Sequence, residues 1–153
     1  MSHPVFCPRR HAIYDDIGRV AARHYYEQIG FTFVPETEQY GAYDLTMQSP
    51  HGEFTHIEVE VTKKWVGRKF PYTHMSVPTR KQNSKADVFV KVNMSGSSIL
   101  VCSMERVKAS PIIQKDTSLS IGERFYNVDV ALISSFYLED GEWYTDDPED
   151  LTP

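Results

Sequence analysis

The strictly alternating run HIEVEVT, residues 56–62, constrains the fold more than any other stretch of the chain. Alternation with a period of two is typical of a β-strand, and it predicts one buried aliphatic face made of Ile57, Val59 and Val61. The opposite face carries polar side chains: His56, Glu58, Glu60 and Thr62. Carboxylates side by side on one strand face repel each other, so each needs water, a cation or a proton.

A third carboxylate precedes this strand in a short apolar run, YDLTM, residues 43–47. The turn-rich segment 48–53 separates the two runs, so we expect them to pair as a β-hairpin. In that hairpin Asp44 can reach the edge that carries Glu58 and Glu60. Three converging carboxylates would form a site for a hard cation. The alternative is an acidic face exposed to solvent, because half-polar strands are common in antiparallel sheets.

Basic residues are concentrated directly after the acidic strand. From residue 63 to residue 91 the only acid is Asp87, and this stretch supplies the candidates for nucleic-acid binding: Lys63, Lys64, Arg68, Lys69, Arg80, Lys81 and Lys85. A local positive field of this kind suits phosphates, although a charge run also occurs on ordinary solvated faces. In residues 66–72 the cations alternate with aromatic rings, which can stack on bases.

The overall charge hides this basic stretch. The chain has a formal net charge of −5, but residues 139–153 contain 7 of its 21 acidic residues and no Lys or Arg. Without them, 16 basic residues face 14 acidic ones, so the rest of the chain is about +2. We therefore expect one domain over residues 1–138 and an acidic C-terminal tail over residues 139–153.

The remaining pattern predicts a helix followed mostly by strands. Helical spacing extends from about Ile13 to Ile29, with Asp15 and Asp16 in the first turn and Gly30 as the stop. Strands are expected at residues 31–34, 43–47, 56–62, 87–92 and 99–103, and a further edge at 106–115. Residues 125–138 are expected to form late strands, or one strand and a turn. A loop or a short helix from Pro78 connects the acidic strand to the later ones.

The sequence also predicts where the protein resides. No apolar run is long enough to span a membrane, and the N-terminus has no uninterrupted apolar segment that would indicate a signal peptide. Cys7 and Cys102 lie far apart and fit no CxxC pattern. We expect free thiols in a reducing compartment, and hence a cytoplasmic protein.

The order of elements and acids resembles the PD-(D/E)XK superfamily, the restriction-endonuclease-like nucleases. The resemblance covers roughly residues 13–103 and rests on Tyr43-Asp44 as the first motif and Glu58-Val59-Glu60 as the second. It implies an α/β (α+β) fold with a restriction-endonuclease-like core, in which a mixed central β-sheet is flanked by helices. It also implies an endonuclease that depends on Mg²⁺ (or Mn²⁺), hydrolyses phosphodiester bonds in DNA and can act as a homodimer.

The resemblance assigns roles to the acids. In that family the Asp and the first acid of the second motif bind magnesium, which here are Asp44 and Glu58, and Glu60 would complete the metal shell or accept a proton. A lysine normally stands two residues after the first acid, but this chain has Glu60 there and Tyr43 where the family has proline. The candidates to replace the missing lysine are Lys64, if the strand continues that far, and Lys81 in the connecting segment.

Three other hypotheses fit the same residues. A nuclease-like fold could bind nucleic acid without cutting it, through its basic segment alone. The acidic tail could mimic nucleic acid and occupy a basic partner in an interaction protein. His56, Glu58 and Glu60 share a predicted strand face, and an imidazole ligand would shift the metal preference toward zinc or manganese.

Overall fold

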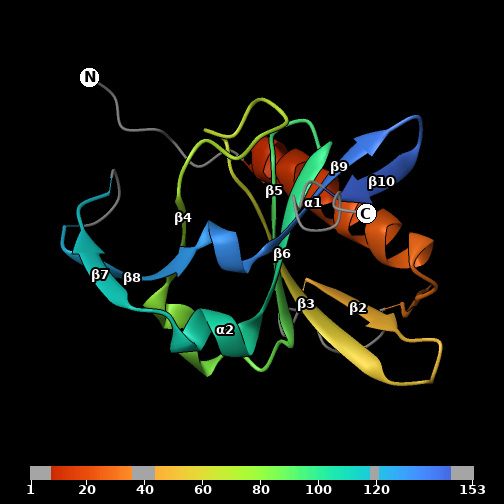
Figure 1. Cartoon of the computed structure of the whole chain (residues 1–153), viewed down its shortest axis with the longest axis horizontal. Helices are drawn as coiled ribbons and strands as arrows, with labels where there is room; N and C mark the ends of the chain where they lie inside the picture. Colours follow the sequence, from red (N-terminus) through yellow and green to blue (C-terminus); the bar gives the residue numbers. More distant parts are fainter. Residues whose placement is uncertain (1–7, 36–43, 118–120, 146–153) are drawn as a thin grey trace.

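The computed structural model describes residues 8–35, 44–117 and 121–145, with side chains from Asp16 onward. A seven-stranded mixed sheet has the order β1-β2-β3-β5-β6-β9-β10, and a three-stranded antiparallel sheet has the order β4-β8-β7. Figure 1 shows the smaller sheet to one side of the larger one, with the long helix α1 along the other. The protein therefore belongs to the α+β class, as the sequence predicted.

The strands are short and close to the predicted positions. The larger sheet consists of β1 (Thr32–Phe33), β2 (Leu45–Gln48), β3 (Phe54–Val61), β5 (Val88–Val92), β6 (Ser98–Ser103), β9 (Ser134–Glu139) and β10 (Glu142–Thr145). The smaller sheet consists of β4 (His74–Pro78), β7 (Ile112–Lys115) and β8 (Glu123–Asp129). All neighbouring pairs are antiparallel except β3 and β5, which are parallel.

Helix α1 (Pro8–Gln28) covers the aliphatic face of the larger sheet. It begins five residues before the predicted start, because proline suits a first helical turn, so the predicted placement of Asp15 and Asp16 in that turn is wrong. Gly30 ends the helix as predicted, with φ at 98°. No helix in the described ranges is long and apolar enough to cross a membrane.

A glycine brings α1 close to the sheet. A Cβ atom at Gly18 would lie 2.8 Å from Cγ1 of Val59 and 3.0 Å from Cγ2 of Val61. The helix can therefore approach β3 more closely than any larger residue would allow. This contact, together with the fully buried Ile57, confirms that the alternating strand has one apolar face.

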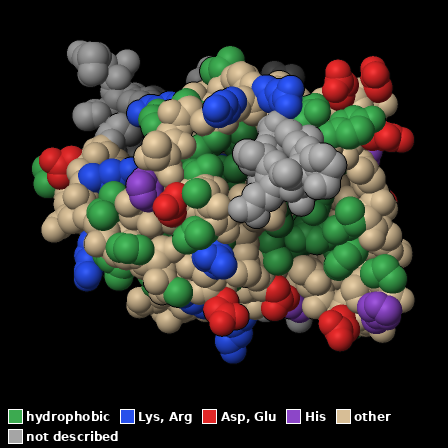
Figure 2. Space-filling model, viewed as in Figure 1, with side chains coloured by type: hydrophobic (Ala, Val, Ile, Leu, Met, Phe, Trp, Pro, Cys, Tyr) green, Lys and Arg blue, Asp and Glu red, His purple; other side chains and the backbone are tan. Residues whose placement is uncertain are grey.

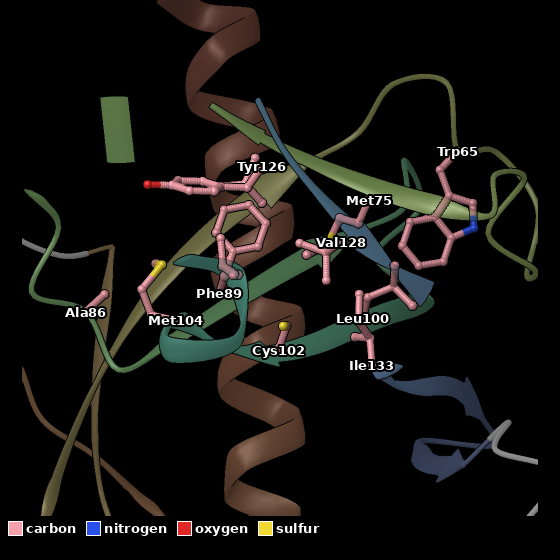
Figure 3. Packing of buried hydrophobic residues seen from close by; sticks show 12 residues of the cluster. Trp65, Met75, Ala86, Phe89, Leu100, Cys102, Met104, Tyr126, Val128 and Ile133 are labelled. Atoms are coloured by element: carbon pink, nitrogen blue, oxygen red, sulfur yellow. The ribbon is translucent and has the colours of Figure 1, made fainter. Parts of the chain in front are cut away.

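The opposite face of the sheet is covered mainly by the smaller sheet rather than by helices. Met75 of β4 and Val128 of β8 pack with Phe89 and Leu100 of the larger sheet in a second core, as Figure 3 shows. The short helix α2 (Met104–Ala109) adds Met104 and Val107 to this core. The predicted flanking of the sheet by helices is therefore correct for one face only.

Three elements, β4, α2 and β10, were not predicted by the sequence. Residues 74–78 form β4 instead of a loop, and η1, a single 3₁₀ turn (Thr79–Asn83), follows at the predicted Pro78 start. Residues 104–109 form α2 where an edge strand was expected. Ser103 accepts a hydrogen bond from the backbone N–H of Arg106, which is typical of a helix N-cap.

The predicted acidic tail begins inside the larger sheet. Strand β10 pairs with β9, and Trp143 is buried against α1. Gln28 of α1 donates a hydrogen bond to the Trp143 carbonyl at 2.8 Å and accepts one from its backbone N–H. The folded unit therefore extends at least to Thr145, and the rest of the predicted tail lies outside the described residues.

Candidate functional site

The β2–β3 hairpin places Asp44 beside Glu58, as the hairpin prediction required. Leu45 is opposite Ile57, and the backbone N–H of Asp44 continues the ladder by donating to the Ile57 carbonyl at 3.2 Å. The Asp44 carboxylate accepts a hydrogen bond from the backbone N–H of Val59 at 2.8 Å. This bond holds the side chain against β3, where Glu58 and Glu60 lie on the face away from α1.

The pKa of the Asp44 carboxyl group reports its surroundings. Burial raises this pKa most, and the hydrogen bond from the Val59 N–H opposes the rise. The charge of Glu58 raises it further, whereas the ammonium group of Lys81 lowers it. Asp44 and Glu58 are thus neighbouring carboxylates whose charges repel each other, and the Lys81 ammonium offsets part of that repulsion.

Glu58 is bound by two side chains from the connection between β4 and β5. Its residue is 9% exposed, Lys81 Nζ lies 3.0 Å from Oε2, and Ser84 Oγ donates to Oε1 at 3.2 Å. Lys81 belongs to η1, which follows directly from β4. The structure therefore brings one of the two predicted lysine candidates to the acid pair.

A second lysine, Lys91, lies at the site and was not among the predicted site residues. Parallel pairing of β3 and β5 places Lys91 beside Glu60, and its Nζ lies 2.9 Å from Glu60 Oε1. The Lys91 side chain is 7% exposed and that of Glu60 is 41% exposed. The only sequence signal was a lone lysine within the otherwise apolar strand VFVKV, where neighbours on both faces of the strand are hydrophobic.

Of the three acids predicted to share one cation, Asp44 and Glu58 lie next to each other, whereas Glu60 contacts a lysine. No group of three or more His, Cys, Asp and Glu side chains in the described ranges is placed to hold a metal ion. Glu60 contacts Lys91, whereas Asp44 and Glu58 interact with each other. The His56 ring contacts Thr46 Oγ1 at 3.1 Å, so the alternative set of His56 with Glu58 and Glu60 does not form a three-ligand group in this part of the chain either.

The other predicted catalytic lysine, Lys64, does not lie on the acidic strand face. Strand β3 ends at Val61, and Lys63 and Lys64 lie in the turn that follows it. The strand ends there because Thr62 and Trp65 close a turn, with the Trp65 N–H donating to the Thr62 carbonyl at 3.1 Å. The prediction that the acidic face continues to Lys64 is therefore wrong.

The remaining basic residues of the predicted stretch are spread over the molecule. The Arg68 guanidinium stacks on the Tyr137 ring of β9 at 3.4 Å, and two strands, β5 and β6, separate β9 from β3. Arg80 lies 3.6 Å from Glu123 on β8, and both Lys69 and Lys85 are exposed. On the face of the molecule that Figure 2 shows, acidic and basic side chains are interspersed. The sequence cluster does not form one continuous basic strip there.

No protein-family model, curated protein or solved structure matches this chain. The geometry of the site must therefore carry the functional argument.

Proposed function

We propose that this protein is a metal-dependent nuclease that hydrolyses phosphodiester bonds in DNA, built on a restriction-endonuclease-like core. The observation that carries the proposal is the placement of Asp44, directly before β2, beside Glu58 on β3, with the Lys81 ammonium 3.0 Å from Glu58. An acid pair can hold a divalent cation, and a lysine beside it can stabilise the charge that develops on a phosphate during phosphoryl transfer. The mixed sheet, covered by α1 on one face, fits the α+β class that the resemblance implies.

Two carboxylates fit Mg²⁺ better than they fit most other cations. Magnesium in nucleotide-processing sites is bound by one or two carboxylates, and water and substrate phosphate complete its octahedral shell. Asp44 and Glu58 would hold Mg²⁺ (or Mn²⁺), since their repulsion favours a cation between them. The chemistry that a bound Mg²⁺ supplies is a polarised phosphoryl oxygen and a more acidic water.

The side chains around the pair can perform the other parts of the reaction. The Glu60 side chain is 41% exposed, and only its Oε1 contacts Lys91 at 2.9 Å, so the carboxylate is placed to accept a proton from an attacking water. Lys81 is 32% exposed and can shift from Glu58 toward a phosphate oxygen. Its ammonium would then stabilise the negative charge that develops on the phosphate.

One observation favours a second function, nucleic-acid binding without cleavage. Lys81 and Lys91 already neutralise Glu58 and Glu60 through contacts of 3.0 Å and 2.9 Å. Such ion pairs can stabilise the sheet without a metal, and the exposed cations would then act only on phosphates.

The experiment that tests the proposal is cleavage of several nucleic acids by the purified protein. Supercoiled plasmid, linear duplex, branched DNA, single-stranded DNA and RNA are incubated with EDTA, Mg²⁺ or Mn²⁺, beside the Glu58→Gln variant prepared in the same way. We expect cleavage of DNA that needs a divalent cation and is lost in the variant. No cleavage by the wild type, or equal cleavage by the variant, would refute the nuclease. Binding without cleavage would assign the second function.

A further inference from the structure

Lys108 of α2 lies outside the predicted basic stretch, and Ser84 connects it to Glu58. Its Nζ donates a hydrogen bond to the Ser84 carbonyl at 2.9 Å, and Ser84 Oγ donates to Glu58 Oε1 at 3.2 Å. The carbonyl and hydroxyl oxygens of one serine are at most about 4–5 Å apart. The Lys108 ammonium therefore lies within about 11 Å of the Glu58 carboxylate.

The position of α2 independently agrees with this contact. The backbone N–H of Met104, the first residue of the helix, donates to the Asp87 carbonyl at 2.9 Å, directly before β5. The β3–β5 register places Glu58 opposite Phe89, two residues after Asp87. Met104 and Phe89 belong to the same core, on the face of the larger sheet away from α1. Helix α2 therefore borders the site on the sheet face that carries Glu58.

Lys108 is exposed, and the carbonyl group that accepts its hydrogen bond carries no net charge. A neutral carbonyl oxygen is a weaker acceptor for an ammonium ion than an anionic phosphate oxygen. An ammonium group has three donors, so the side chain can bind a phosphate in addition to the Ser84 carbonyl or in its place. Lys85, the residue after Ser84, is also exposed and supplies a further cation beside α2.

The charges of the site predict when an anion should bind beside α2. In the metal-free protein, the carboxylates of Asp44 and Glu58 offset the ammonium groups of Lys81 and Lys108. A divalent cation between the two acids neutralises both carboxylates, so the two ammonium groups lose that compensation. The exposed Glu105, three positions before Lys108 on α2, offsets only part of the positive charge. Coulomb attraction then favours a polyanion such as the DNA backbone.

We infer that Lys108 binds a backbone phosphate of the DNA that occupies the site, so that the bound strand extends from the acid pair past Ser84 to α2. This inference rests on the proposed function, because it takes DNA and a divalent cation from it. Phosphates follow one another at about 3.4 Å along the axis of one strand, so this second contact lies within about three nucleotides of the phosphate at the acid pair. Binding of DNA through Lys108 is expected to be stronger when a divalent cation is present.

The test is a fluorescence anisotropy titration of a labelled DNA duplex on ice, in EDTA or Ca²⁺, at several salt concentrations, with gels to check that the duplex stays intact. We expect Lys108→Ala to weaken binding in Ca²⁺ about 3-fold to 10-fold and to reduce the slope of log K against log[salt] by about 1. Lys108→Arg should restore both values, because it keeps the positive charge. The matched control is Arg106→Ala, which removes an exposed cation from the same helix. Residues two positions apart do not share a helix face, so this control should leave the slope unchanged.

The outcomes separate this inference from the proposed function. A purely structural role of Lys108 in holding Ser84 would lower the Tm of Lys108→Ala and leave its salt slope unchanged. An unchanged slope for Lys108→Ala, or an equal loss in Arg106→Ala, overturns the inference even if the protein cleaves DNA. A loss specific to Lys108→Ala in a protein that cuts no nucleic acid supports the surface and refutes the nuclease. A wild type that does not bind DNA in Ca²⁺ overturns both.

Discussion

The variant Asp44→Asn separates the electrostatic cost of the acid pair from its capacity to hold a cation. Asparagine can still accept the Val59 N–H through its carbonyl oxygen, and its amide group can donate to Glu58. The cost of burying the Asp44 charge, which raises the pKa of this group most, disappears, and so does its repulsion with Glu58. We therefore expect the metal-free variant to be at least as stable as the wild type at pH 7.

The effect of pH on this difference follows from the direction of the pKa shift. The pKa of Asp44 is raised in the folded protein, so ionising this group costs more in the folded than in the unfolded state. This cost is absent below the ordinary carboxyl pKa of about 3.9 and is complete above the raised pKa. The stability advantage of Asp44→Asn should therefore be absent at pH 3 and should grow as pH rises from about 4.

Mg²⁺ should reverse the order of stability of the wild type and Asp44→Asn at pH 7. At a hundredfold excess over its dissociation constant, Mg²⁺ stabilises the wild type by about 2.7 kcal/mol, which raises the Tm by about 5–11 °C for a chain of this size. Asp44→Asn loses one of the two anionic ligands and should gain less than half of that shift. Thermal unfolding followed by circular dichroism measures the Mg²⁺-induced Tm shift of each protein. The control is Asp16→Asn, which removes an exposed carboxylate from α1. Equal Mg²⁺ shifts in all three proteins would refute the acid pair as the metal site.

Three further predictions concern the packing around α1 and the C-terminal residues. Gly18→Val should destabilise the fold by about 1–3 kcal/mol in thermal unfolding, because its Cβ would lie 2.8 Å from Val59, and Val59→Ala in the same chain should recover part of that loss. Trp143→Ala should cost about 3–5 kcal/mol, because this side chain is 4% exposed in the core beneath α1. Deleting residues 146–153 alone should leave the thermal stability unchanged, and retained activity of that variant would contradict the acidic-tail hypothesis.

The sequence predicted the part of the site that depends on local pattern. Alternation in residues 56–62 and the turn at residues 48–53 are sufficient to predict the hairpin, because both act between neighbouring segments of the chain. The hairpin register then brings Asp44 next to Glu58. Gly30 was also predictable, since a helix that ends in the left-handed region favours glycine.

The cationic part of the site depends on pairings between distant segments. Nothing near Lys91 in the sequence specifies that β5 pairs in parallel with β3, which places this lysine beside Glu60. Similarly, β4 follows a long irregular connection, and η1 directly after it carries Lys81 to Glu58. A motif pattern that expects the lysine on the same strand as the acids therefore points to the wrong segment.

The ion pair between Glu60 and Lys91 joins a partly exposed acid on β3 to a buried lysine on β5. The Lys91 side chain is 7% exposed, so without Glu60 its charge would be buried and uncompensated. Each single reversal, Glu60→Lys or Lys91→Glu, places like charges together and should cost about 3–5 kcal/mol in urea unfolding. The double variant restores opposite charges on the paired strands and should recover more than half of the summed loss. Additive losses would show that the two side chains do not interact, whereas recovery of stability would establish that the lysine charge can be supplied from either strand.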